Sequence, residues 1–176
     1  DPAVRSRLIP FQFNTAETYV LEFAHQKMRV IKGGSGGTAG DGGYMLEAAT
    51  AISGITRANP GIVTTTVPHG FGNGDHVWID GVTAPSGPMA EVNRRRFAIT
   101  GATATTFELA GVDTSAWPVW ASGGAAARFY TLATPYASAD LPLLKFVQSA
   151  DTMTLTHPGH APRNLTRTGH TSWTLV

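Results

Sequence analysis

The sequence predicts an all-β fold made of short strands separated by tight turns. Three observations support this class. Hydrophobic and polar residues alternate over several short stretches, which is the period of a half-buried strand. Thr and Val are abundant, and their β-branched side chains suit a pleated surface better than a helix. The 20 Gly and 11 Pro residues interrupt the chain too often for long helices.

Near the N-terminus, an antiparallel meander of three strands is predicted. The strands occupy the ranges 7–14, 19–23 and 28–31. In the first strand, Phe11 and Phe13 alternate with polar residues, and in the second strand Tyr19, Leu21 and Phe23 share one face. These apolar faces are expected to pair with the C-terminal part of the chain or with another molecule.

Glycine dominates the next segment, residues 32–43, and predicts a flexible loop because glycine has no side chain to pack. A glycine-rich loop can cradle a phosphate, but the P-loop motif needs Lys and Ser or Thr after its last glycine. Here Tyr44 and Met45 follow Gly43, which argues against a phosphate site. Residues 44–51 are compatible with either a short helix or a strand.

A separate module of short strands is predicted over residues 53–130. The range 62–67 is rich in β-branched residues, and Asn73-Gly74 is a strong hairpin signal before a return strand at 76–79. In that return strand, His76 and Trp78 face away from Val77 and Ile79. Further strands are predicted at 96–100, 106–109 and 125–132. Short strands at this spacing are typical of a small β-barrel or sandwich.

The C-terminal part, residues 131–176, predicts a short helical turn followed by strands. Ser138 is the expected N-cap of the turn over 137–144, and Pro142 limits its length. The strands are predicted at 146–147, 152–156, 163–167 and 171–175. This succession of strands and turns resembles one blade of a β-propeller.

Composition narrows the classes of function. Charged residues are 14% of the chain, below the roughly 25% typical of soluble domains, and this deficit is a sign of assembly with a partner. The net charge is +1 without a sustained basic stripe, and there is no cysteine for disulfides or thiolate metal sites. No apolar run is long enough to span a membrane. Because the chain starts with Asp1 and lacks an initiator Met, we expect it to be part of a longer protein.

Two sets of segments resemble proteins of bacteriophage tails. The first set is similar to the tail nozzle-like, or tail tubular, structural protein of short-tailed phages and prophages; it comprises residues 7–14, 19–23, 28–31, 139–158, 162–167 and Trp173. The second set is similar to a small β-module of phage tail proteins, labelled after the FCCH domain of the ubiquitin-activating enzyme; it comprises residues 55–64, 69–75, 79–82, 93–97 and 106–115. This module carries no adenylation or thioester machinery.

The resemblance implies a larger, propeller-like platform of antiparallel strands, built from residues 1–52 and 131–176 and carrying residues 53–130 as an inserted barrel. It also implies a structural role in the virion tail, assembled in the bacterial host cytoplasm. Copies of the protein would form a ring, in contact with neighbouring tail proteins. DNA would pass through this ring without sequence-specific recognition.

The sequence predicts no catalytic, cofactor or metal site, and the protein is not expected to be an enzyme. His157, His160 and His170, with Asp151 nearby, are the only candidates for a metal site. The first two lie in a Pro-Gly turn in which side chains three residues apart can converge. The simpler interpretation is that these histidines are solvated or bond to backbone carbonyls.

Two further arrangements would imply an enzyme. His69, His76 and Asp75 flank the predicted hairpin, but no nucleophile elbow accompanies them, so turn support is the simpler interpretation. The carboxylates are scattered and show no paired signature of a glycosidase. A tail-associated polysaccharide depolymerase is therefore the least favoured alternative.

Two groups of residues are candidates for an interaction surface. Arg94, Arg95 and Arg96 could face DNA or an acidic neighbouring subunit, or they could simply blunt an exposed strand edge. Trp117 and Trp120, with Tyr130, could stack on a host-surface glycan, which would make the module a binding domain. The alternative is that the two indoles close the end of the module's core.

Overall fold

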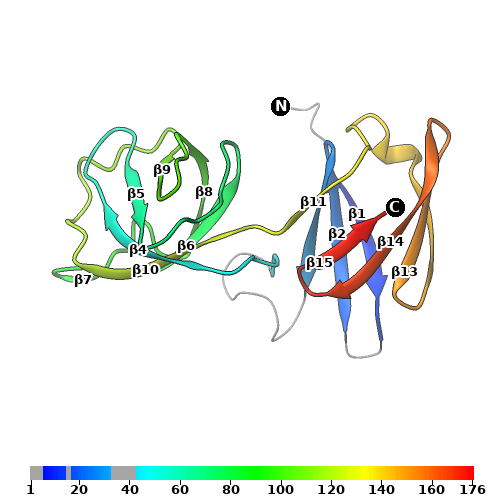
Figure 1. Cartoon of the computed structure of the whole chain (residues 1–176), viewed down its shortest axis with the longest axis horizontal. Coiled ribbons are helices and arrows are strands. Elements are labelled where there is room, and N and C mark those ends of the chain that lie inside the picture. The colour runs from blue at the N-terminus through cyan, green and yellow to red at the C-terminus, as the bar shows by residue number, and fades with distance from the viewer. Residues whose placement is uncertain (1–5, 15–16, 33–42) are drawn as a thin grey trace. The chain divides into compact units, whose positions relative to one another are not determined.

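The computed structural model describes residues 6–14, 17–32 and 43–176, and its regular structure is β-strand apart from one 3-10 turn. The predicted glycine-rich loop falls mainly on residues 33–42, outside the described part. None of the described segments is a helix with the length and apolarity to cross a membrane. The chain divides into two compact units (Figure 1). We call Asp1–Met45 with Tyr130–Val176 the split unit, and Leu46–Phe129 the barrel unit.

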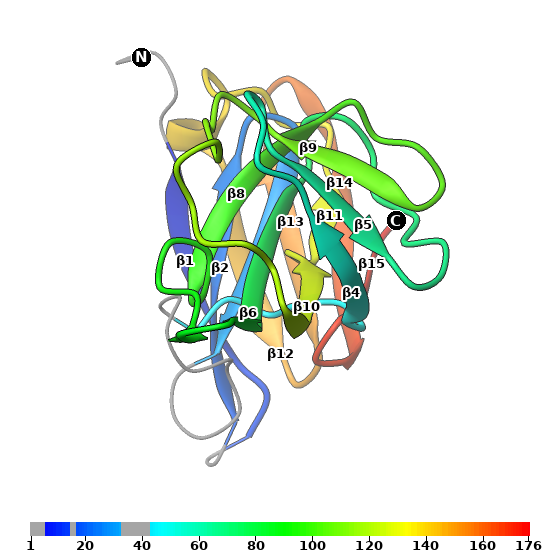
Figure 2. The same cartoon turned by 90° about the vertical axis from the view of Figure 1, so that its left-hand side faces the viewer.

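Six antiparallel strands close the barrel unit. They are β4 (Thr50–Ile55), β5 (Ile62–Thr65), β6 (His76–Ala84), β8 (Arg95–Thr100), β9 (Thr106–Leu109) and β10 (Ser122–Arg128). The order of pairing is β10-β4-β5-β9-β8-β6, and a second pairing between β10 and β6 completes the ring (Figure 2). The short β7 (Gly87–Pro88) pairs antiparallel with the end of β6. Closure removes free strand edges, because each strand of the ring has a hydrogen-bonded neighbour on both sides.

Alternating side chains of these strands fill the barrel. Val63, Val77, Ile79, Ile99 and Phe107 are fully buried in one cluster. Their positions follow from the two-residue period of a strand, which points every second side chain inward. Trp78 is also buried, although it lies on the opposite face of β6, so this strand is covered on both faces rather than half-exposed as an alternating pattern suggests.

Two glycines let β10 pair with both of its neighbours. Gly123 and Gly124 have φ angles of 70° and 97°, a conformation that other residues rarely adopt. A Cβ atom on Gly124 would lie 2.4 Å from Cγ2 of Val82 on the facing strand. The close approach that seals the barrel therefore requires glycine.

The boundaries of the barrel unit differ from those predicted. The undecided segment 44–51 is extended rather than helical: Leu46 bridges Phe129, and Ala51 pairs with Ala125 inside the barrel. The predicted strand 125–132 is two elements, β10 and the short β11 (Thr131–Ala133), which belong to different units. The alternation of apolar and polar residues continues from one element into the next. It depends only on local burial and does not show which strand each residue pairs with.

Two four-stranded antiparallel sheets form the split unit. The first has the order β1 (Arg7–Gln12), β2 (Thr18–Ala24), β3 (Lys27–Lys32) and β11. The second is a meander of β12 (Lys145–Ser149), β13 (Thr152–His157), β14 (His160–Gly169) and β15 (Ser172–Leu175). A 3-10 turn, η1 (Leu141–Leu143), precedes β12. Its N-cap is Asp140 rather than the predicted Ser138, and the Asp140 carboxylate accepts the Ala137 N–H.

The two sheets enclose a single core. Phe11, Tyr19, Leu21 and Phe23 from the first sheet lie in one buried cluster with residues of the second sheet, including Trp173. The Trp173 ring packs edge-on against Phe11 and Tyr19, with centroid distances of 4.8 and 5.7 Å. The apolar faces predicted near the N-terminus are therefore covered by the C-terminal half of the same chain, except for Phe13, which is 36% exposed.

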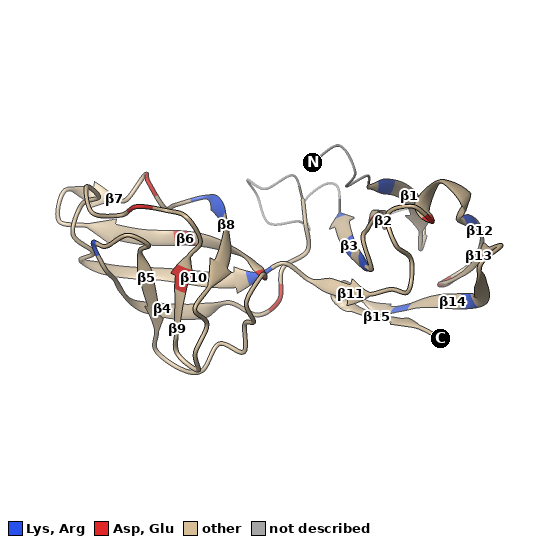
Figure 3. Cartoon of the chain, turned by 90° about the horizontal axis from the view of Figure 1, so that it is seen from above, with Lys and Arg blue, Asp and Glu red and all other residues tan. Residues whose placement is uncertain are grey.

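Side chains, rather than strand ladders, join the sheets at their margins. Arg7 donates to the carbonyls of Leu141 and Leu144 beside β12. The Gln148 amide accepts from the backbone N–H of Gln12 at 3.1 Å and donates to its carbonyl at 2.7 Å. At the opposite margin, the Trp173 N–H donates to the Tyr130 hydroxyl. Figure 3 shows the strands of this unit around their core, with β1 beside β12 and β11 beside β15.

Replacing Trp173 with Ala tests whether the two sheets depend on each other. The change removes an indole that contacts both sheets, so we expect a loss of about 3–5 kcal/mol of unfolding free energy, measured by chemical denaturation. Val176→Ala, at an exposed residue after β15, is the control and should change stability by less than about 0.5 kcal/mol. Equal effects of the two changes would contradict a shared core.

Candidate metal centre

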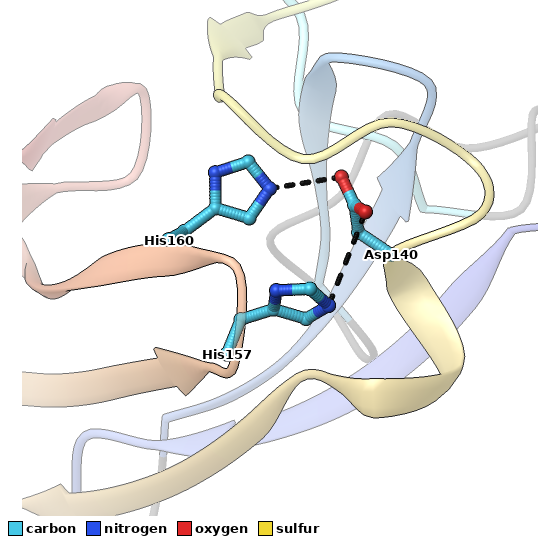
Figure 4. A group of neighbouring side chains, drawn as sticks. All are labelled: Asp140, His157 and His160. Carbon is cyan, nitrogen blue, oxygen red and sulfur yellow. Dashed lines mark hydrogen bonds and ion pairs between the residues drawn. The ribbon is translucent and has the colours of Figure 1, made fainter.

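Two histidines and an aspartate converge at one end of the split unit (Figure 4). Nε2 of His160 lies 2.9 Å from Oδ2 of Asp140, and Nε2 of His157 lies 3.9 Å from Oδ1 of the same carboxylate. One ligand atom from each of the three residues lies within 4.8 Å of the others. This is the one group of three or more potential metal-ligating side chains in the described part of the chain.

The hairpin between β13 and β14 brings the two imidazoles together. The register of the ladder shifts after Leu155, so that His157 pairs with His160 across a Pro-Gly turn. The ring centroids are then 4.9 Å apart. The Gly159 N–H donates to Nδ1 of His157 at 2.9 Å and orients that ring within the turn. Asp140 approaches from the other side, at the start of η1.

Contacts on the Asp140 carboxylate favour its charged form. The hydrogen bond with His160 lowers the pKa of Asp140 below its ordinary value, and the Ala137 N–H lowers it further, while burial has a smaller opposing effect. His157 differs from its neighbours because its side chain is only 6% exposed. Its Nε2 is buried and has no hydrogen-bond partner among the described residues, since 3.9 Å to Asp140 is too long for a hydrogen bond.

The structure brings together only part of the histidine set predicted from the sequence. His157 and His160 converge, but His170 lies elsewhere, with Nδ1 2.7 Å from the Tyr19 hydroxyl. Asp151 is not part of the cluster. The sequence did not identify Asp140 as a candidate ligand. The turn η1, the strand β12 and most of β13 separate it from His157, so no short spacing connects the two residues. The only signal at Asp140 is its place before a Leu-Pro turn.

A second polar cluster, formed by Arg167, Glu17 and Tyr19, lies in the same unit and contributes to its packing. The Arg167 side chain is 8% exposed and donates to Glu17 at 3.0 Å and to the Tyr19 hydroxyl at 2.7 Å. Its guanidinium also lies over the Phe13 ring, 4.2 Å from the centroid. Since these contacts bind the cation from several sides, we interpret the cluster as a structural anchor of β14.

In the barrel unit, the three predicted arginines do not form one surface. Arg94 has a φ of 56° and lies 3.9 Å from Asp80, whereas Arg95 and Arg96 occupy successive positions of β8. Successive strand residues point to opposite faces, so these exposed side chains diverge. Their arrangement does not provide the basic stripe that tracks a nucleic-acid backbone.

The predicted tryptophans contact the core of the barrel. Trp117 and Trp120 are half-buried against it, and the Trp117 ring lies 6.4 Å from that of Phe97. The Trp120 indole N–H donates to the Gly123 carbonyl at 3.1 Å. These contacts agree with indoles that close the end of the barrel, and they leave only part of each ring for a ligand.

The histidine and aspartate near the predicted hairpin support the turn. Nδ1 of His69 accepts the Phe71 N–H at 2.9 Å, and the Asp75 carboxylate accepts the Gly72 N–H at 2.8 Å. Arg128 forms ion pairs with Glu47 and Asp75. Its hydrogen bond with Glu47 has the largest effect on its pKa, which is raised, and the contact with Asp75 raises the pKa further. His69 and Asp75 are therefore engaged in local structure rather than arranged as a base and its orienting group, and His76 lies in β6 opposite Ala98.

Comparison of the sequence with protein families and curated proteins found no match. No family model matches the chain, and no curated protein shows significant sequence similarity to it. The class that the fold defines is thus an all-β protein with a closed six-stranded barrel and a separate pair of four-stranded sheets. The likeness to phage tail proteins stays a hypothesis that rests on the sequence segments alone.

Replacing Arg167 with Ala tests the anchor on β14. The change leaves the buried Tyr19 hydroxyl without its guanidinium donor, so we expect a loss of about 2–3 kcal/mol of unfolding free energy. Arg95→Ala, at an exposed arginine of β8, is the control and should change stability by less than about 0.5 kcal/mol. Thermal and urea unfolding measure both variants, and equal stability of the two would contradict an anchoring role for Arg167.

Proposed function

We propose that this chain is a non-catalytic structural component of a bacteriophage tail, of the nozzle-like or tubular kind, that associates with copies of itself. The proposal rests on the sequence resemblance and on one structural observation, an exposed apolar margin on the split unit. This margin consists of Leu8, Leu143 and Val147.

The apolar margin follows two strands that lie at the ends of their sheets. The side chains of Leu8 on β1 and Val147 on β12 are 60% and 68% exposed. The Gln12–Gln148 hydrogen bonds place the two strands beside each other, so their exposed groups belong to one region. Apolar side chains gathered on outer strands favour contact with another molecule, and open strand edges favour it further.

The order of strands supports a propeller-like platform as part of this proposal. Each sheet has four antiparallel strands, the number found in a propeller blade. The first strands of the two sheets, β1 and β12, are neighbours, and contacts near the last strands, β11 and β15, join the opposite margin. Two consecutive blades of a propeller share this arrangement. We infer that further sheets, from copies or from neighbouring tail proteins, would pack on this pair.

Low charge and internal use of polar groups support a role in assembly rather than in catalysis. Charged residues are 14% of the chain, and the buried Arg167 as well as Arg128 bind carboxylates of the same unit. In the proposed virion, copies surround a channel through which DNA passes without sequence-specific contact.

Self-association provides the direct test. The full chain should form oligomers whose mass, measured by light scattering after size-exclusion chromatography, increases with concentration. Leu8→Glu with Val147→Glu should shift it to a monomer, because charges replace the apolar margin. Val119→Glu, at an exposed apolar residue of the barrel unit, is the control and should keep the oligomer. A wild-type chain that is monomeric at its highest soluble concentration would contradict the proposal.

The glycan-binding alternative makes a different prediction for the half-buried indoles. If the role is structural, host-surface polysaccharide should leave the fluorescence of Trp117 and Trp120 unchanged and should not be cleaved. Saturable quenching that Trp120→Phe removes would favour a binding module instead. Release of reducing sugar ends by the purified chain would favour a depolymerase.

A further inference from the structure

We propose that Asp140, His157 and His160 bind a zinc ion. Two imidazole nitrogens and one carboxylate oxygen are common zinc ligands, at bond lengths of about 2.0–2.2 Å and in tetrahedral geometry. Donor atoms around such an ion lie about 3.3 Å apart. Here Nε2 of His160 lies 2.9 Å from one Asp140 oxygen and Nε2 of His157 lies 3.9 Å from the other. One ligand atom from each residue lies within 4.8 Å of the other two, so modest side-chain movement forms the site.

The unpartnered nitrogen of His157 is an independent observation in favour of a ligand. Nε2 is buried, lies toward the Asp140 carboxylate and makes no hydrogen bond within the described residues (Figure 4). Buried polar atoms are nearly always satisfied, and an exception points to a bound water or ion. A cation between His157, His160 and Asp140 would satisfy this atom.

Zinc binding requires a defined protonation state of the rings. A neutral imidazole that coordinates through Nε2 carries its proton on Nδ1. Nδ1 of His157 now accepts the Gly159 N–H, so coordination gives up this hydrogen bond. Gly159 lies in an exposed turn, where its N–H can bond to water instead. At His160, no described residue bonds to Nδ1, and that nitrogen can hold the proton.

The donor set also selects the class of metal. Calcium and magnesium prefer all-oxygen sites, and the chain has no cysteine for thiolate coordination. Three protein ligands leave a fourth zinc position, which we assign to water. The ion would tie the turn before η1 to the β13–β14 hairpin. This inference does not depend on the proposed tail function.

Metal titration of the tag-free full chain, first stripped with a chelator, tests the site. We expect one equivalent of Zn²⁺ to bind, measured by competition with a chromophoric chelator, and Co²⁺ to give the visible absorption of tetrahedral coordination. Asp140→Asn, His157→Gln and His160→Gln should each weaken zinc binding at least tenfold. His170→Gln is the matched control, a histidine outside the cluster, and should bind zinc as the wild type does.

A second measurement on the wild-type chain covers the case in which a variant fails to fold. Substoichiometric Co²⁺ should broaden the imidazole NMR resonances of His157 and His160 and leave those of His170 and His69 sharp. Absence of saturable zinc binding to the wild type would overturn the proposal. Unchanged affinity in folded His157→Gln and His160→Gln variants, or broadening centred on His170, would overturn it as well.

Discussion

The burial of two apolar sheet faces in one core is the constraint on which the split unit depends. Its strands come from two chain segments that are separated by the barrel unit, Leu46–Phe129, and each sheet offers one face to the other. The intervening chain must therefore leave and return at neighbouring points. It does so where the Tyr130 N–H bonds to the Met45 carbonyl at 2.9 Å and Leu46 bridges Phe129. A closed barrel, with a core of its own, meets this requirement.

The two units treat their strand edges differently, and this difference bears on assembly. In the barrel unit, the pairing of β10 with β6 leaves the ring without an open edge. In the split unit, glutamine and arginine side chains hold the margin between β1 and β12 while Leu8 and Val147 stay exposed. Self-association is therefore proposed at this margin, where apolar side chains are exposed.

The candidate metal centre depends on the same core. Tyr136 and Leu141, on either side of Asp140, are almost fully buried and fix the position of its loop. Leu155, two residues before His157, is fully buried in the same cluster and fixes the hairpin from the other side. The three candidate ligands thus lie on anchored segments. Preorganisation of this kind lowers the cost of ordering ligands when an ion binds.

By itself, the sequence determined the all-β class, most strand positions and the apolar face that carries Tyr19, Leu21 and Phe23, because a strand's two-residue period is a local property. It also placed His157 and His160 in one turn. Tertiary structure alone decided that residues 125–132 divide between two units and that Asp140 joins the histidines, while His170 binds Tyr19 instead. Alternation shows which face is apolar but carries no information about the distant segment that covers it.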